Sequence, residues 1–195
     1  GKGDIREPFI EVTYPNGSST TDMVFDRAEI IQGKEEYDTL PGSYDDNGEV
    51  EQLVIYLKDR NYNLTLELHY YVYEKCDIIT RSAKLVNSGN ESVRIERLMS
   101  MQLDLNESDY ELSFFNGAWA REMNRSRIPI RAGKYVNESV TGTSSNRANP
   151  FFMIGRSSTT EDYGECYGFN LIYSGNHYEA CLLYTSPSPR DGLLS

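Results

Sequence analysis

The most regular feature of the chain is an alternation of apolar and polar positions through residues 49–105. Side chains on a β-strand point alternately to the two faces of a sheet, so a period of two predicts strands. Polar, turn-forming stretches at 59–61, 74–77 and 87–90 interrupt the alternation. The pattern predicts four consecutive strands that share one apolar face, formed by Leu53, Ile55 and Leu57; Leu64, Leu66, Leu68, Tyr70 and Val72; Ile79, Arg81, Ala83 and Leu85; and Val93, Ile95, Arg97, Met99, Met101, Leu103 and Leu105.

Weaker signals lie on both sides of this region. Strands are predicted at residues 9–14, 110–115, 151–154 and 167–173, and residues 23–31 are predicted to be extended or irregular. The stretches 117–149 and 156–164 are rich in Arg, Asn, Ser and Gly, which predicts long surface loops. An apolar sheet face needs a second layer to cover it, so we expect an all-β fold, a supersandwich of two mainly antiparallel sheets around one core.

Composition agrees with strands and narrows the partners. The chain has 195 residues, a length that suits one domain, and its 15 Tyr residues favour strands over helices. A net charge of −11 disfavours binding to nucleic-acid phosphates or to anionic lipid, because both need a cationic surface. No apolar run approaches the roughly 20 residues of a membrane-spanning helix. We therefore expect neither a nucleic acid nor a membrane as a partner.

The cysteines and histidines do not indicate a metal site. Cys76, Cys166 and Cys181 are widely spaced, which predicts neither a disulfide framework nor zinc binding and suggests a reducing, cytoplasmic compartment. His69 and His177 lie far apart in sequence, and His69 falls on the face opposite the apolar positions around it. We expect no metal and no cofactor.

No pattern of residues predicts catalysis within the chain. The adjacent acids Asp45–Asp46 and Glu35–Glu36 are expected to be solvated loop charges, because neighbouring side chains diverge in a strand and face water in a turn. Trp119, beside Arg121, has two interpretations. Its ring is either a platform for a sugar or a contact at a domain or subunit boundary.

Several motifs occur in an order that resembles one enzyme family. They are GDIREP at residues 3–8, TLPGSY at 39–44, DIITRS at 77–82, GAWARE at 117–122, SSNRANPF at 144–151 and GECYGFNLIYSGN at 164–176. Together they resemble the N-terminal β-sandwich domain of the α-galactosidases of glycoside hydrolase family 36, over nearly all of residues 3–180. Two motifs depart from the family pattern: TLPGSY stands for GLPATY, and Asn146 occupies a position that is usually His, so no role of that His carries over.

The resemblance implies a non-catalytic domain of a larger enzyme. The parent would be a retaining, exo-acting α-galactosidase that removes terminal α-linked galactose from melibiose- and raffinose-type oligosaccharides. Its two catalytic Asp residues would lie in a (β/α)₈ barrel after residue 180, and more of the sandwich would precede residue 1, so the domain would be incomplete at both ends. No residue here would be catalytic, and the chain alone would be inactive. The sandwich would support the barrel and a homo-oligomer, with Trp119 and Arg121 as candidate contact residues.

The C-terminal tail needs a separate interpretation. Residues 181–191, CLLYTSPSPRD, resemble the translation of a sequencing-library adapter. This predicts a domain at residues 1–180 and a non-native tail at 181–195 in which Cys181 has no place in the core. The alternative is a true strand end followed by a Ser/Pro-rich linker.

Two other functions remain open from the sequence. A free-standing carbohydrate-binding sandwich would need several exposed aromatic rings in one patch. A structural or interaction sandwich of a surface protein would be indicated by paired cysteines or repeated domains, and the sequence has neither pattern.

Overall fold

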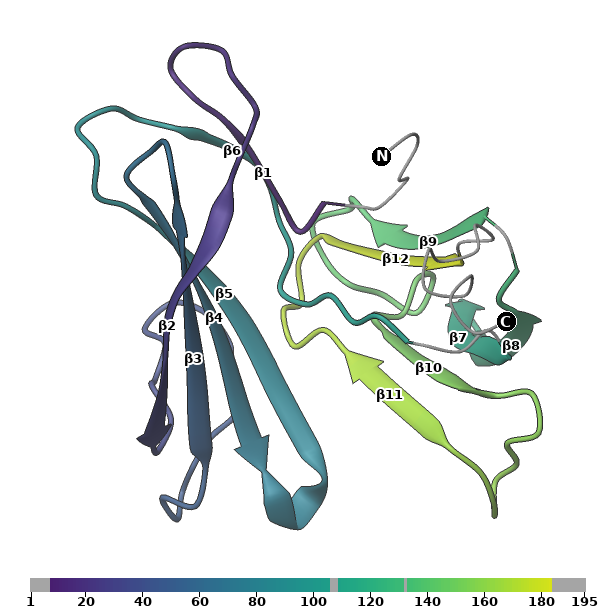
Figure 1. Cartoon of the computed structure of the whole chain (residues 1–195). Helices are drawn as coiled ribbons and strands as arrows, with labels where there is room; N and C mark the ends of the chain where they lie inside the picture. Colours follow the sequence, from purple (N-terminus) through teal and green to yellow (C-terminus); the bar gives the residue numbers. More distant parts are fainter. Residues whose placement is uncertain (1–7, 106–108, 132, 184–195) are drawn as a thin grey trace, which may run out of the picture. The chain divides into compact units, whose positions relative to one another are not determined.

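The computed structural model describes residues 8–105, 109–131 and 133–183, and almost every regular element in it is a β-strand (Figure 1). The chain divides into two compact units, unit 1 up to Asp104 and unit 2 from Leu105 onward. Strand pairing is antiparallel throughout the described residues. The all-β prediction is confirmed.

Unit 1 is built on a four-stranded meander in the order β2-β3-β4-β5. Its strands are β2 (Met23–Gln32), β3 (Glu51–Asp59), β4 (Leu64–Tyr73) and β5 (Ile78–Asn87), and a short 3₁₀ turn, η1 (Glu74–Cys76), joins the last two. Figure 1 shows the four strands side by side. The alternation in the sequence sets the faces: Leu64, Leu66 and Leu68 share one face of β4, whereas Glu67 and His69 lie on the other.

The fourth predicted strand leaves this sheet. It is β6 (Arg94–Leu98), which ends well before Leu105 and pairs with β1 (Ile10–Thr13) instead of β5. This two-stranded ribbon contributes Val12 to a small core with Tyr14 and Leu64. A period of two identifies a strand and its faces but not its neighbour, so the prediction of a single meander through residue 105 was wrong at β6.

The segment between β2 and β3 crosses the polar face of the unit 1 sheet. Tyr37 Oη lies 2.8 Å from Tyr71 Oη and 2.5 Å from Ser82 Oγ, and Ser43 Oγ lies 2.6 Å from Tyr73 Oη. Burial and the contact with Tyr37 raise the pKa of Tyr71 above its usual range. These hydroxyl contacts fix an otherwise irregular segment over β4 and β5.

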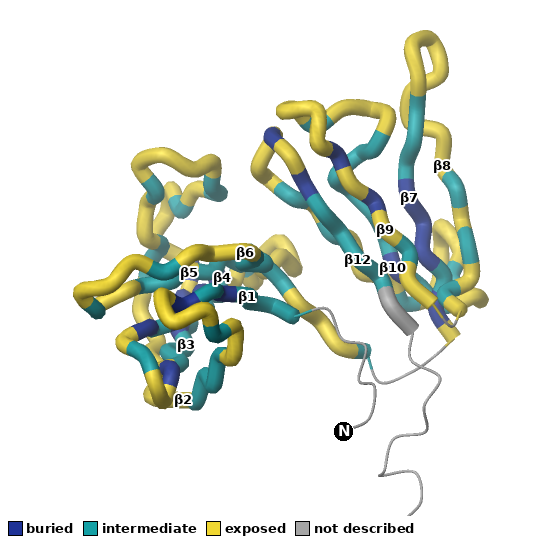
Figure 2. Tube along the Cα trace, turned by 90° about the horizontal axis from the view of Figure 1, so that it is seen from above, coloured by how far each residue is buried: buried dark blue, intermediate teal, exposed yellow. Residues whose placement is uncertain are grey.

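Unit 2 has its own sheet, in the order β11-β10-β7-β8, and a separate strand pair, β9 with β12. The strands are β7 (Tyr110–Ala118), β8 (Arg121–Pro129), β9 (Gly133–Ser139), β10 (Phe151–Arg156), β11 (Cys166–Asn170) and β12 (His177–Leu183). Figure 2 shows buried positions concentrated along β7 and exposed ones along β8.

The core of unit 2 forms where the β9–β12 pair meets the sheet. Leu112, Phe114 and Ile154 are buried there, and the ring of Tyr135 on β9 lies 4.8 Å from that of Phe114. Because each unit has its own core cluster, the structure differs from the single core expected from chain length. None of the helices in the described residues has the length and apolarity to span a bilayer.

Two sequence predictions fail in unit 2. Residues 117–149 were expected to be a loop, but they contain β8 and β9; β8 is an edge strand with polar residues on both faces, so it lacks the alternation that identifies a half-buried strand. Cys181 was expected to lie outside the core, but β12 continues to Leu183 and Cys181 packs against the core cluster. The rest of the proposed tail, from residue 184, lies outside the described residues.

Candidate functional site

Three of the sequence motifs, far apart along the chain, meet at one end of unit 2, which we call the motif end: residues 117–122, 144–150 and 171–176. The backbone N–H of Ser144 donates to the carbonyl of Ser174 at 2.7 Å, and that of Leu171 donates to Pro150 at 3.1 Å. The N–H of Gly142 donates to Asn176 Oδ1 at 2.7 Å. The residues of the three motifs therefore form one local structure.

Gly117 shows why this end requires particular residues. A Cβ atom at Gly117 would lie 2.8 Å from the carbonyl oxygen of Arg121 and 3.1 Å from that of Asn146. Both are backbone atoms, which cannot move without disturbing the hairpin. Only glycine permits the hairpin strands and the 144–150 segment to approach this closely. Asn146, the position that departs from the family pattern, thus contributes its backbone to the contact.

The GAWARE motif forms a β-hairpin, where the sequence predicted a loop. Ala118 pairs with Arg121 across β7 and β8, so Trp119 and Ala120 form a two-residue turn. Ala120 has a φ of +60°, and its N–H donates to Glu122 Oε1 at 3.1 Å. The side chain of Asn124 donates to the carbonyl of Arg121 at 2.7 Å. These local bonds support the tip without using the indole ring.

Trp119 is 95% exposed at the tip of this hairpin, and Arg121 is exposed at the start of β8. The two candidate residues thus lie on one hairpin, Trp119 in its turn and Arg121 at the start of its second strand. An indole so exposed contributes nothing to the core of its own unit.

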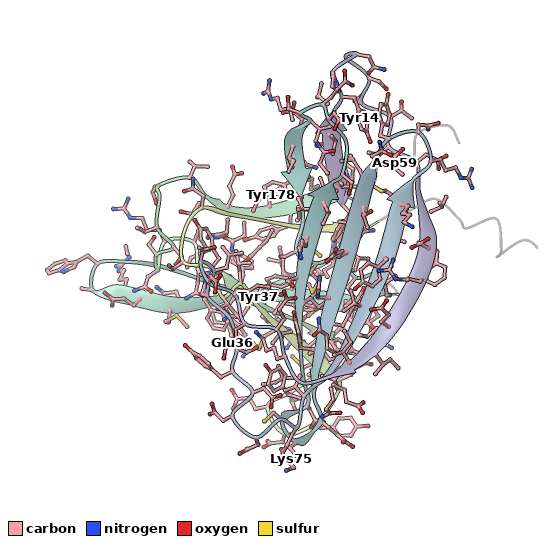
Figure 3. The ribbon with its side chains drawn as sticks, turned by 90° about the vertical axis from the view of Figure 1, so that its left-hand side faces the viewer. Tyr14, Glu36, Tyr37, Asp59, Lys75 and Tyr178 are labelled. Carbon is pink, nitrogen blue, oxygen red and sulfur yellow. The ribbon has the colours of Figure 1, made fainter. Side chains whose placement is uncertain are left out.

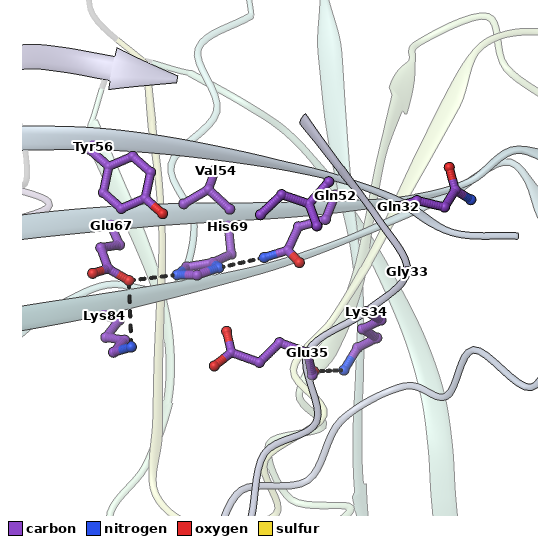
Figure 4. A pocket seen from close by; sticks show the side chains of 11 residues that line it. Gln32, Gly33, Lys34, Glu35, Gln52, Val54, Tyr56, Glu67, His69 and Lys84 are labelled. Atoms are coloured by element: carbon purple, nitrogen blue, oxygen red, sulfur yellow. Dashed lines mark hydrogen bonds and ion pairs between the residues drawn. The ribbon is translucent and has the colours of Figure 1, made fainter. Parts of the chain in front are cut away.

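A second group of polar side chains lies on unit 1, and we call it the polar row: Gln52, His69, Glu67 and Lys84 (Figure 4). Gln52 Nε2 donates to His69 Nδ1 at 2.9 Å, so the ring proton sits on Nε2, which donates to Glu67 Oε2 at 3.2 Å. Lys84 Nζ lies 3.6 Å from the same oxygen. Strand register explains the row, since these positions are cross-strand neighbours on one face of β3, β4 and β5.

The polar row forms the floor of a recess of about 560 Å³. Its walls include Ile31, Lys34 and Glu35 from β2 and the segment after it, and Val54 and Tyr56 from β3. Sequence reasoning treated His69 as an ordinary strand residue and missed the recess. The available signal was the repetition of polar residues at alternate positions of neighbouring strands.

At one end of the unit 1 sheet, Asp59 is buried among hydrogen-bond donors (Figure 3). Its Oδ2 accepts from Tyr14 Oη and from the N–H of Asp22, both at 3.0 Å, and its Oδ1 accepts from the N–H groups of Asn61 and Tyr62 at 2.8 and 3.1 Å. Burial favours the neutral acid, but these donors outweigh it, so the pKa of Asp59 lies below its usual value. Asp59 thereby connects the β3–β4 turn to the segment that leads into β2.

Glu179 in unit 2 has the opposite environment. It lies opposite Asn137 on the paired strands β9 and β12, and Asn137 Nδ2 donates to it at 2.8 Å. Burial raises the pKa of Glu179, and the single bond from Asn137 only partly offsets this. Two positions earlier, His177 is buried, neither ring nitrogen has a hydrogen-bond partner within the described residues, and burial lowers its pKa.

The carboxylate pairs considered from the sequence do not form an acid–base site. Asp45 accepts hydrogen bonds from the backbone N–H groups of Glu49 and Val50, which is a turn-stabilising role, and Asp46 is exposed. Within the described residues, no cluster of three or more His, Cys, Asp or Glu side chains has metal-binding geometry.

Known proteins are similar to this chain over nearly its whole length, including the three motifs of the motif end. The profile of the glycosyl hydrolase family 36 N-terminal domain matches residues 1–182. The chain belongs to this family. Alpha-galactosidase C of Emericella nidulans is 36% identical over 176 residues, and alpha-galactosidase AgaA of Geobacillus stearothermophilus is 38% identical over 177. Each alignment covers 90% of this chain and 24% of the relative.

Solved structures show the same fold. The α-galactosidase of Lactobacillus brevis superposes with a TM-score of 0.91 at 39% identity, covering 95% of this chain and 25% of that protein. AgaA of Geobacillus stearothermophilus superposes with a TM-score of 0.90 at 36% identity, covering 95% and 26%. This family 36 N-terminal domain therefore spans about a quarter of the length of the relatives it matches.

Proposed function

We propose that this chain is the non-catalytic N-terminal domain of an α-galactosidase that hydrolyses terminal α-galactosyl residues of melibiose- and raffinose-type oligosaccharides. The observation that carries the proposal is the coverage: 90–95% of this chain aligns with 24–26% of each α-galactosidase. Variants of AgaA have been solved in complex with stachyose and raffinose. We extend this substrate class from AgaA to the parent of the present domain.

The reaction itself would take place outside this chain. A retaining glycosidase needs a carboxylate nucleophile and a second carboxyl group about 5–5.5 Å away as general acid and base. Asp59 and Glu179 do not meet this need, because the first is saturated with structural hydrogen bonds and the second is a half-buried residue of β12 that accepts a hydrogen bond from Asn137. We therefore assign catalysis to two Asp residues of a separate barrel, with the present chain inactive by itself.

The domain's own contribution would be support and assembly. Trp119 offers a large, rigid apolar surface at a hairpin tip that local hydrogen bonds hold in place. Exposed Trp residues of this kind often contribute most of the binding energy at a protein interface. Arg121 follows on the same tip and would add a planar cationic group. We assign the pair to contacts with an adjoining domain or with a second subunit of a homo-oligomer.

The alternative of a free-standing sugar-binding module is less well supported. It requires several exposed rings in one patch. Among the described residues of unit 2, Trp119 and Tyr163 have the most exposed rings, and the half-exposed Tyr173 is the ring that shares the motif end with Trp119. Trp119 lies between β7 and β8, whereas Tyr163 lies between β10 and β11. Because β7 and β10 are antiparallel, these two turns are at opposite ends of the sheet.

We place the parent in the cytoplasm. The support is that Cys76, Cys166 and Cys181 are all free thiols, and two of them are exposed. Exposed thiols persist unpaired in a reducing compartment.

A chimera tests the proposed enzyme. Residues 1–180 of this chain would replace the aligned N-terminal quarter of AgaA, and hydrolysis of raffinose and of p-nitrophenyl α-galactoside would be measured. We expect the chimera to hydrolyse both and the 195-residue chain alone to hydrolyse neither. Hydrolysis by the repurified chain, or a folded chimera without activity, would contradict the proposal.

Trp119→Ala tests the contact role in the same chimera. Loss of the indole should weaken association of the chimera's domains or subunits by about tenfold, because buried Trp residues commonly dominate interfaces. Size-exclusion chromatography with light scattering and limited proteolysis between domains would measure this. Tyr163→Ala is the matched control, since it removes another highly exposed ring, from the other end of the sheet. Equal effects of the two substitutions would contradict the assignment of Trp119.

A further inference from the structure

The recess above the polar row is a second feature that the support role does not use. Its volume of about 560 Å³ falls within the range of small-molecule sites, roughly 300–1,000 Å³. All of its lining residues belong to unit 1, so its geometry depends on one compact body. We propose that this recess binds a neutral, polyhydroxylated molecule of monosaccharide to disaccharide size.

The floor is already ordered for binding. His69 and Gln52 are each 4% exposed, and their hydrogen bond fixes both side chains. Within the described residues, neither the Gln52 amide oxygen nor Glu67 Oε1 accepts a hydrogen bond, whereas Glu67 Oε2 accepts from His69 and pairs with Lys84. The floor therefore presents two fixed acceptors, the Gln52 amide oxygen and Glu67 Oε1. The hydroxyl groups of a ligand could donate hydrogen bonds to both.

The charges around the recess favour a neutral ligand over an ion. Glu67 and Lys84 lie on the sheet, and Lys34 and Glu35 lie on the segment that follows β2, which gives two carboxylates and two ammonium groups. Figure 4 shows the carboxylate of Glu35 in the open space beside the row. An anion would meet Glu35 and Glu67, and a cation would meet Lys34 and Lys84. A hydroxyl group both donates and accepts, so it suits all four.

Part of the wall is apolar, which a sugar or cyclic polyol requires for its C–H surface. Val54 lies between Gln52 and Tyr56 on the same face of β3, and Ile31 contributes from β2. The Tyr56 ring is held by Arg27, whose guanidinium carbon lies 3.7 Å from the ring centroid. Fixed polar groups beside a small apolar wall are the usual composition of a small-molecule site.

The proposal is tested on the purified 195-residue chain by ligand-observed NMR and calorimetry. The probes are methyl α-D-galactopyranoside, melibiose, myo-inositol and inorganic phosphate. We expect saturable binding of at least one sugar or of inositol, with a dissociation constant on the order of 1 mM, and no competition by phosphate. The inositol arm separates a general polyol site from a sugar site. This experiment measures binding and not hydrolysis, so a negative result would not contradict the proposed α-galactosidase function.

Two pairs of variants locate the site. Glu35→Ala and Lys84→Ala remove exposed groups at the recess, and each should weaken binding by about tenfold. Glu36→Ala and Lys75→Ala are the matched controls in the same unit and should not change it (Figure 3). The proposal would be overturned if neither sugar nor inositol bound saturably, or if phosphate bound in preference to them. It would also be overturned if the control substitutions weakened ligand binding as much as Glu35→Ala and Lys84→Ala do.

Discussion

Asp59 in unit 1 and Glu179 in unit 2 are both carboxylates removed from much of the solvent, and their pKa values move in opposite directions. Asp59 accepts four hydrogen bonds, three of them from backbone N–H groups, and remains ionised. Glu179 receives one bond, from Asn137, and its charge is opposed by the burial. The comparison shows that the supply of donors, rather than burial alone, decides whether a carboxylate stabilises a fold.

The largest effect is expected at Asp59. Asp59→Ala leaves three backbone N–H groups and the Tyr14 hydroxyl without their acceptor, so unit 1 should lose about 3 kcal/mol of stability. Hydrogen exchange of peptides from β3 and β4, followed by mass spectrometry, would resolve this loss from any change in unit 2. Asp46→Ala, at an exposed loop position, is the control. A loss no greater than that of the control would break the comparison.

The lowered pKa of Asp59 determines how the stability of unit 1 changes with pH. Because its folded pKa is lower than the ordinary value of 3.8, Asp59 contributes stability above about pH 4, and this contribution is lost as the pH falls through the folded pKa. The stability difference between the native chain and Asp59→Ala should therefore narrow in acid. A difference that stays constant from pH 7 to pH 3 would contradict the ionic role.

A smaller loss is expected when one donor is removed. Tyr14→Phe deletes the hydroxyl that donates to Asp59 but keeps the ring, whose centroid lies 3.4 Å from that of Tyr62. The expected cost is about 1.5 kcal/mol, the usual worth of one hydrogen bond to a charged group. Urea unfolding with exchange detection in unit 1 measures it, and Tyr44→Phe, at a highly exposed ring, is the control. No difference between the two variants would show that Asp59 needs only its backbone donors.

The smallest effect, with the opposite sign, is expected at Glu179. Glu179→Gln keeps an acceptor for Asn137 and removes the buried charge, so unit 2 should gain about 1 kcal/mol at pH 7. A raised folded pKa means that the penalty is present above that pKa and absent below the ordinary value of 4.5, so the gain should vanish near pH 4. Glu138→Gln, the exposed neighbour on β9, is the control for exchange rates in β9 and β12. Destabilisation by Glu179→Gln at pH 7 would contradict the desolvation argument.

The sequence predicted β3, β4 and β5 from their apolar faces. Leu64, Leu66 and Leu68 identified β4, and the turn residues on both sides located its hairpins. β8 was missed because an exposed edge strand has no apolar face to reveal a period of two. Cys181 was excluded from the core because of its tail-like sequence context, although the strand pairing of β12 with β9 continues through it.

The candidate sites divide in the same way. Trp119 and Arg121 were found from a local motif, and the structure places both on one hairpin tip. The recess was not predicted, because Gln52, Glu67 and Lys84 come from three strands and meet only through cross-strand register. Register depends on hairpin geometry as well as on residue type, so single-strand patterns did not reveal this grouping.

The sequence by itself determined the all-β class, the apolar faces of the long strands and membership in the family, since each depends on local order along the chain. Only the tertiary structure decided that β6 pairs with β1, that three motifs converge at the motif end and that Asp59 is surrounded by donors. The physical reason is that these features depend on contacts between distant segments. Such contacts are selected by packing and hydrogen-bond satisfaction across the whole unit.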